Sequence, residues 1–200
     1  VAIKEALNRA GVAPESVDEV IMGTVLQAGQ GQIPSRQAAT KAGIPWGVKT
    51  ETINKVCASG MRAVTLADQL IRLGDEETIV AGGMESMSNA PYYLPKGRFG
   101  LRMGDAQMID GMIYDGLSCS FDPKRVHMGT YGNATAEKFD LSREKQDEWS
   151  FRSHDLALKA IDNGTFAEEI IAVEVPQRKG DALKFDQDEA PRRDTSTESL

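Results

Sequence analysis

Strand-like and helix-like segments alternate between residues 1 and 83, and this alternation most constrains the fold. Three segments have apolar residues at helical spacing, and three have the apolar or alternating pattern of strands. In chain order they are 1–10 (helix), 17–25 (strand), 34–42 (helix), 48–53 (strand), 58–73 (helix) and 78–81 (strand). Because strands that alternate with helices form parallel sheets covered by helices, the sequence predicts an α/β fold with a mainly parallel sheet.

The pattern changes near residue 89. Prolines and glycines crowd together without a clear period from Pro91 to Gly104, which predicts a long loop-rich region, and long loops are usually functional. Helical patterns return at 129–139 and 142–163, a strand pattern follows at 170–175, and the tail from 180 to 200 is polar and charged. We therefore divide the chain into a core domain, residues 1–89, and an inserted loop domain, residues 90–200.

The charge and the cysteine content exclude several classes of protein. The 200 residues include 23 basic and 30 acidic side chains, for a net charge of −7, which argues against general binding to nucleic acid or to an anionic membrane. No apolar run approaches the ~18 residues of a membrane span. The two cysteines make no disulfide framework, and no Cys/His cluster has the spacing of zinc ligands. We expect a protein of a reducing compartment, the cytoplasm.

A cysteine between a strand and a helix is the strongest chemical signal. In Ile53-Asn-Lys-Val-Cys57-Ala-Ser-Gly-Met61, the strand pattern ends and the helix pattern begins at Cys57. The first amides of a helix are unpaired and carry partial positive charge, so they stabilise a thiolate and can donate to an oxyanion. A lone cysteine is also among the most commonly buried residues, and the spacing alone leaves both interpretations open.

Several motifs together resemble the thiolase family. The segment Asn54–Met61 resembles the thiolase nucleophile motif. The other matching segments follow in family order: Glu19–Gln32, Ala81-Gly-Gly-Met-Glu-Ser-Met-Ser88, His127-Met-Gly-Thr, Leu141-Ser-Arg, Arg178-Lys-Gly-Asp and Asp188-Glu-Ala-Pro-Arg192. They cover nearly the whole chain. The resemblance implies a thiolase-like layered α/β fold in which 1–89 is the N-terminal core domain and 90–200 the loop domain for coenzyme A (CoA) binding and oligomerisation.

The resemblance also implies a reaction. Thiolases join or split acyl-CoA thioesters by a ping-pong Claisen reaction, so Cys57 would attack a thioester and carry the acyl group. In the family, the Cys57 N–H forms part of an oxyanion hole. CoA enters as substrate and product, and no metal or bound redox cofactor is expected. The implied activity is that of an acetyl-CoA C-acetyltransferase, which makes acetoacetyl-CoA from two acetyl-CoA.

Four more residues match family positions that contact CoA. His127 and Met128 match the pair that lines the pantetheine end in short-chain thiolases, Leu117 matches a position near CoA, and Arg192 matches the arginine along the adenine. Taken alone, His127 is an ordinary loop histidine, Met128 and Leu117 are packing residues, and Arg192 is a surface arginine. Cys119 matches no family motif. By analogy we expect a dimer of dimers, with 93–112 at the tetramer contact.

Thiolases are longer than this chain. The family motifs that carry the activating histidine and the second cysteine are absent, and so is the first core strand, so we expect an internal piece with little turnover by itself. Three other functions stay open. They are a long-chain 3-oxoacyl-CoA thiolase of fatty-acid degradation, a non-catalytic CoA- or lipid-binding module, and a condensing enzyme such as a ketoacyl synthase.

Overall fold

A computed structural model describes residues 1–200, which form two compact units. The first is Ala2–Met128 and the second is Gly129–Leu200, with which Val1 is grouped. Residues 90–128 thus belong to the unit that contains the sheet, whereas the sequence-based boundary lies at residue 89. That boundary separates functional domains rather than compact units, and it stays a prediction.

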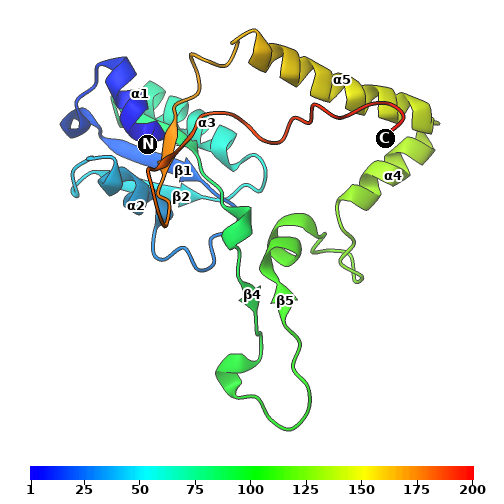
Figure 1. Ribbon diagram of the computed structural model, residues 1–200. Helices are drawn as coiled ribbons and strands as arrows, with labels where there is room; N and C mark the ends of the chain where they lie inside the picture. The colour runs from blue at the N-terminus through cyan, green and yellow to red at the C-terminus, as the bar shows by residue number, and fades with distance from the viewer. The chain divides into compact units, whose positions relative to one another are not determined.

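The first unit is built on a parallel sheet of three strands, two of which, β1 and β2, are labelled in Figure 1. The strands are β1 (Glu19–Gly23), β2 (Lys49–Ile53) and β3 (Ile79–Gly83), in the order β2-β1-β3. The register places Gly23 of β1 beside Ile53 of β2 and Gly83 of β3, so the three strands end together. The predicted α/β fold with a parallel sheet is confirmed.

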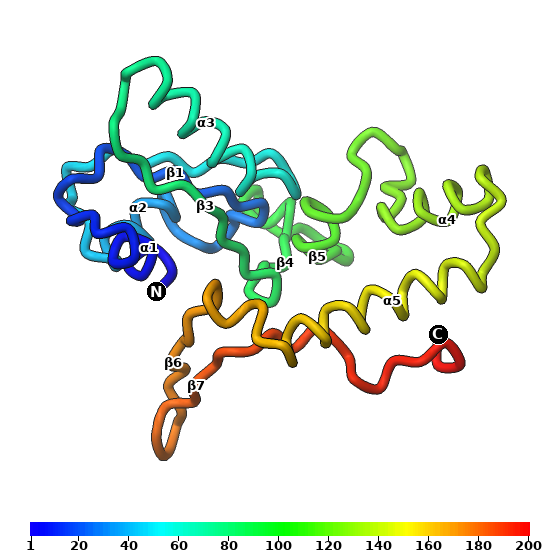
Figure 2. Tube along the Cα trace, turned by 90° about the horizontal axis from the view of Figure 1, so that it is seen from above, coloured from blue at the N-terminus to red at the C-terminus, as the bar shows by residue number.

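Helices cover both faces of this sheet, as Figure 2 shows. They are α1 (Ala2–Ala10), α2 (Pro34–Lys41) and α3 (Ser59–Leu73). Successive side chains of a strand point to opposite faces. Val20 therefore packs with α1 and α2 in the main core, and Ile21 points toward α3, where Ala63 and Ala67 are buried. Val20 and Ile21 are fully buried, and each such side chain contributes about 1.5–3 kcal/mol, so the central strand anchors both layers.

Proline and glycine mark two of the helix ends. Pro34 is the first residue of α2, where its missing N–H costs nothing. Gly74 ends α3 with φ +78°, a left-handed conformation that glycine adopts without the strain of a Cβ, and its N–H donates to the Ile71 carbonyl.

A narrow arm leaves the sheet after residue 89. The short strands β4 (Tyr92–Tyr93) and β5 (Ile109–Asp110) pair antiparallel, and a π-helical turn, Met112–Leu117, follows them. The Tyr93 hydroxyl donates to Asp115 Oδ2 at 2.6 Å, and this bond raises the pKa of Tyr93 to about 12. The bond therefore ties the base of the arm to the π-helical turn.

The second unit contains two helices and a hairpin. They are α4 (Gly129–Lys138), α5 (Arg143–Asp162), and the antiparallel strands β6 (Val173–Val175) and β7 (Leu183–Phe185). Ser142 is the N-cap of α5, and its Oγ accepts from the Lys145 N–H at 3.4 Å. None of the helices in the structure combines the length and the apolar character that crossing a bilayer requires.

Candidate active site

Cys57 lies in the turn between β2, which ends at Ile53, and α3, which begins at Ser59. The side chain is exposed rather than packed among apolar residues. The structure therefore places Cys57 at a strand-to-helix turn, as its sequence context predicts, with its side chain accessible. The turn lies at the carboxyl ends of parallel strands, which is where open α/β sheets bind their ligands.

Close backbone packing fixes the start of α3 on the sheet. A Cβ added to Gly23 would lie 2.3 Å from the Ser59 carbonyl carbon and 2.5 Å from the Gly60 nitrogen. A Cβ added to Gly83 would lie 3.3 Å from the Gly60 Cα. The ends of β1 and β3 and the first turn of α3 thus meet without side chains between them, and this contact sets the position of the Cys57 turn.

The residue before Cys57 has a strained backbone. Val56 has φ +49°, a left-handed conformation that a β-branched residue rarely adopts and that costs about 1–3 kcal/mol. Its N–H donates to Asn54 Oδ1 at 2.9 Å, and its carbonyl accepts from Ser59 Oγ at 2.6 Å. Ser59 Oγ also accepts from the Lys55 N–H at 2.8 Å. These bonds hold the strained turn around Cys57 in one conformation.

Glu85 makes a second set of bonds that sequence reasoning missed. Its carboxylate accepts three hydrogen bonds from the loop after β1. The donors are the Val25 N–H at 2.8 Å, the Leu26 N–H at 3.1 Å and the Thr24 hydroxyl at 3.2 Å. The Val25 carbonyl in turn accepts from Asn54 Nδ2 at 3.2 Å. An acidic residue just beyond the glycine end of a strand is the signal that could have identified Glu85.

The predicted CoA contacts Leu117, His127 and Met128 lie together in the first unit. The Met128 N–H donates to the Leu117 carbonyl at 2.9 Å, and Ser118 and His127 form an antiparallel bridge. The Cys119 N–H donates to the Val126 carbonyl at 3.0 Å and extends this pairing. Met128 is 51% exposed, so its side chain is open to a ligand. The structure therefore brings Leu117 next to His127 and Met128, about ten residues further along the chain, through one short antiparallel backbone pairing.

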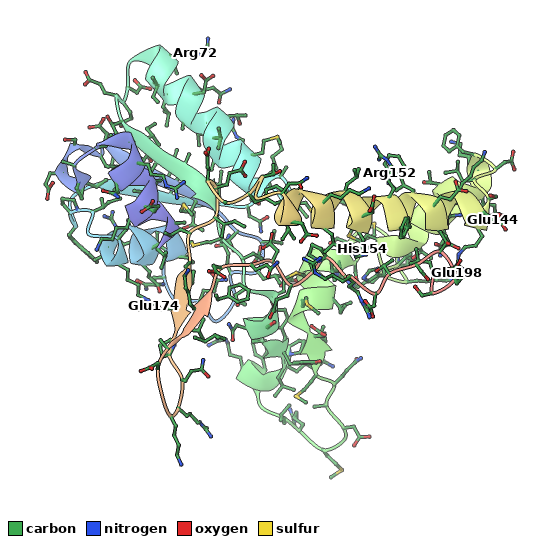
Figure 3. The ribbon with its side chains drawn as sticks, turned by 45° about the horizontal axis from the view of Figure 1, so that its top comes forward. Arg72, Glu144, Arg152, His154, Glu174 and Glu198 are labelled. Carbon is green, nitrogen blue, oxygen red and sulfur yellow. The ribbon has the colours of Figure 1, made fainter.

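Arg192 belongs to the second unit. Its backbone N–H donates to Nδ1 of His154, which Figure 3 shows on α5, at 3.1 Å. Its guanidinium pairs with Asp194 at 3.1 Å, and this pair raises the pKa of Arg192. The ion pair engages the edge of the guanidinium, whereas stacking on an adenine would use its face, so the two contacts are compatible.

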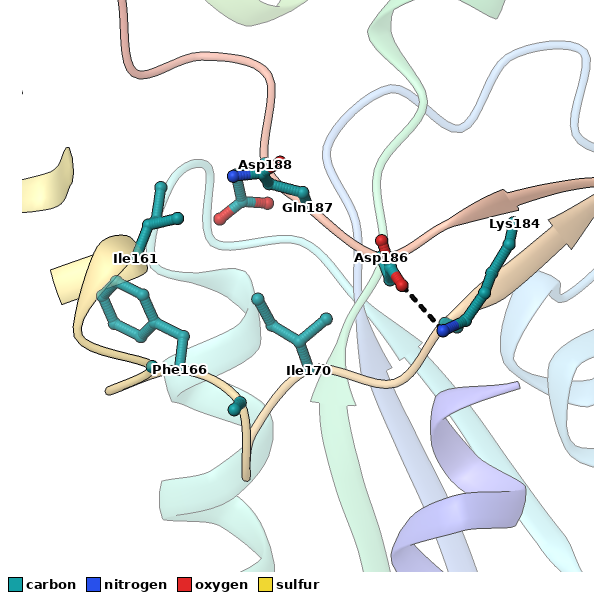
Figure 4. Close-up of a pocket in the computed structure, with 10 residues that line it drawn as sticks. Ile161, Phe166, Ile170, Lys184, Asp186, Gln187 and Asp188 are labelled. Carbon is teal, nitrogen blue, oxygen red and sulfur yellow. Dashed lines mark ion pairs between the residues drawn. The ribbon is translucent and has the colours of Figure 1, made fainter. Parts of the chain in front are cut away.

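The second unit also contains a hollow between the end of α5 and the β6–β7 hairpin (Figure 4). Its volume is about 400 Å³, and apolar side chains such as Ile161, Phe166 and Ile170 face the Lys184–Asp186 ion pair across it. None of the residues predicted for the site lines this hollow.

The profile of a family described as "Thiolase, N-terminal domain" matches residues 1–200. The chain belongs to the thiolase family. It is 52% identical over 198 residues to an acetyl-CoA acetyltransferase of Pseudomonas aeruginosa, a match that covers 99% of this chain and 50% of the relative. It is 51% identical over 200 residues to an acetyl-CoA acetyltransferase of Cupriavidus necator, which covers all of this chain and 50% of that relative.

A solved thiolase structure has the same fold. The crystal structure of the Bacillus anthracis acetyl-CoA acetyltransferase superposes with a TM-score of 0.93 at 38% identity and covers 99% of this chain and 49% of that one. The thiolase-like α/β fold predicted from the motifs is thus confirmed. The chain spans about half the length of the curated relatives it matches.

Proposed function

We propose that this thiolase chain provides the nucleophile of an acetyl-CoA C-acetyltransferase. The observation that carries the proposal is the exposed Cys57 in a strained turn at the carboxyl edge of the parallel sheet. Both relatives described above, which match this chain over 198 and 200 residues, are named acetyl-CoA acetyltransferase.

The reaction runs in two half-reactions. The Cys57 thiolate attacks the carbonyl carbon of acetyl-CoA, the carbonyl oxygen takes the negative charge, and the tetrahedral intermediate collapses to acetyl-Cys57 with release of CoA thiolate. A second acetyl-CoA then loses an α-proton, which in the net reaction ends on the released CoA thiolate. The resulting carbanion attacks the carbonyl carbon of acetyl-Cys57, a carbon–carbon bond forms, and Cys57 leaves as thiolate with acetoacetyl-CoA as product. The reverse sequence is thiolysis. Amides of the Cys57 turn are suited to stabilising the oxyanion.

The remaining parts of the proposal concern the ligand and the assembly. Leu117, His127 and Met128 would contact the pantetheine end of CoA, and Arg192 would stack on the adenine. CoA is substrate and product, and no resident metal or redox cofactor takes part. Two pairs of subunits would form a cytoplasmic homotetramer. The His127–Met128 pair favours a short acyl chain.

Trapping the acyl intermediate tests the proposal. The full-length protein is mixed with acetyl-CoA and digested, and mass spectrometry locates the acetyl group. We expect it on Cys57. Replacement Cys57→Ala should lower thiolysis of acetoacetyl-CoA by about a thousandfold or more, whereas Cys119→Ala, the matched control, should leave it unchanged. Normal thiolysis by the Cys57→Ala variant would refute the proposal.

A substrate series separates the proposal from its rivals. Comparable or faster thiolysis of a long-chain 3-oxoacyl-CoA would identify a long-chain thiolase instead. CoA binding without thiolysis, together with a Cys57 that iodoacetamide alkylates only above about pH 8.5, would identify a non-catalytic binding module.

A further inference from the structure

We infer that Glu85 is a positioning residue for the Cys57 turn, acting through the loop at residues 24–26 and through Asn54. The inference rests on the proposed function, because it assigns Glu85 a role in the same site. The hydrogen bonds of Glu85 go to Thr24, Val25 and Leu26 and not to Cys57. Its effect passes along a continuous chain of contacts from the end of β3 to the residue before the nucleophile.

The first link joins Glu85 to the loop after β1. Two backbone N–H groups and one hydroxyl converge on the two oxygens of one carboxylate, at 2.8, 3.1 and 3.2 Å. Bonds to an ionised acceptor are stronger than bonds between neutral groups. Glu85 is exposed and each bond competes with water, so the loop is held by the three together. Thr24 and Leu26 on the loop side are buried, at 1% and 5% exposure, and share the rigidity of the core.

The second link joins the loop to the nucleophile turn. Asn54 uses both ends of its amide, because Nδ2 donates to the Val25 carbonyl and Oδ1 accepts from the Val56 N–H. If the Val25 carbonyl moves, the Asn54 amide loses the contact that fixes its rotation. Val56 then loses one of the bonds that hold its φ at +49°. A strained residue persists only where its surroundings over-determine it, so the loss of the Asn54 contact releases the turn that presents Cys57.

The test compares two glutamates at opposite ends of β3 in the full-length protein. Glu85→Gln keeps the size of the side chain but turns one acceptor into a donor that faces N–H groups. Glu77→Gln makes the same chemical change at an exposed residue before the strand. We expect Glu85→Gln to lower kcat for thiolysis about tenfold with KM changed less than about twofold, and Glu77→Gln to change neither. Equal kcat in Glu85→Gln and wild type would overturn the inference.

Two more measurements separate positioning from a general loss of stability. We measure the rate of Cys57 alkylation by iodoacetamide as a function of pH. The midpoint of its increase should lie at a higher pH in Glu85→Gln than in wild type. Asn54→Ala should lower kcat as well, and the double variant should be no slower than the slower single variant, since both act along one path. Additive losses in kcat, or an unchanged alkylation profile, would show a merely structural role.

The design also covers misfolding and failure of the proposed function. If Glu85→Gln does not fold, Thr24→Val removes only the hydroxyl donor. It should lower kcat about two- to threefold at an unchanged melting temperature, and an unchanged kcat would overturn the inference. If the wild-type protein catalyses no thiolysis, the proposed function fails, while the alkylation profiles of wild type and Glu85→Gln still decide whether Glu85 positions Cys57.

Discussion

Replacing Gly23 by alanine tests whether backbone contact with β1 sets the position of Cys57. The new Cβ would lie 2.3 Å from the Ser59 carbonyl carbon, whereas ordinary contacts begin at 3.4 Å. The atoms of Ser59 and Gly60 that the new Cβ would meet all belong to the backbone, so a change of side-chain rotamer cannot relieve the clash. The start of α3 must therefore move by about 1 Å. Overpacking of a core costs about 1–3 kcal/mol, and we expect Gly23→Ala at the upper end of that range.

The same displacement should reduce activity. The Cys57 turn precedes α3 directly, so a shift of about 1 Å in the helix start moves the nucleophile, and misplacement of that size can cost about a hundredfold in rate. The assays are urea unfolding and thiolysis of acetoacetyl-CoA by the full-length protein. We expect the free energy of unfolding to fall by about 3 kcal/mol and kcat by one to two orders of magnitude.

Gly82→Ala is the matched control, since its Cβ would meet only the Met22 side chain, whose Cε and Sδ would lie at an ordinary 3.6 and 3.7 Å. This variant should stay within about 1 kcal/mol of wild type, because alanine also restricts the unfolded chain. Gly83→Ala, with a 3.3 Å contact to the Gly60 Cα, should be intermediate. If Gly23→Ala matched Gly82→Ala in stability and activity, the reasoning from backbone contact would be wrong.

Three further predictions concern single polar contacts. Two backbone N–H groups before β3 donate to Asp18 and hold its pKa below its usual range, so this contribution to stability is present above about pH 4 and is lost as pH falls through the lowered pKa. The stability gap between wild type and Asp18→Asn, measured by denaturation, should therefore close in acid, and a constant gap would contradict this account. The Asp115 bond raises the pKa of Tyr93 to about 12, so Tyr93→Phe should remove a tyrosine component near pH 12 from an ultraviolet titration; loss of a component near pH 10 instead would argue against the bond. Ser59→Ala removes two hydrogen bonds of the Cys57 turn and should cost about 1–3 kcal/mol in urea unfolding, with a slower alkylation of Cys57 as the local readout.

Local signals were sufficient to predict most of the first unit. The helix predicted over 58–73 is α3, Ser59–Leu73, because its apolar period is clear and Gly74 marks its end. The position of Cys57 followed from the same signals, since it lies where a strand pattern meets a helix pattern. Such signals depend on neighbours a few residues away, and they are present in the sequence itself.

The missed features depend on residues far apart along the chain. The strand β7, Leu183–Phe185, is only three residues long and lies in a polar tail, so no period reveals it. β4 and β5 are shorter still and lie on either side of a long loop. The bonds from the loop after β1 to Glu85 cross about sixty positions. Residue propensities and spacing rules do not predict these pairings, because the pairings form only when distant segments of the chain come together in the fold.

Three constraints from different elements meet at residues 54–59. The glycine contacts hold the start of α3 from the sheet, Ser59 holds the turn from the helix, and Asn54 holds it from the loop after β1. Together these constraints hold the Val56 backbone, with its φ of +49°, in one conformation. It follows that loosening the Asn54 constraint, which lies outside the core formed by β1, α1 and α2, should affect the reactivity of Cys57 more than the overall stability.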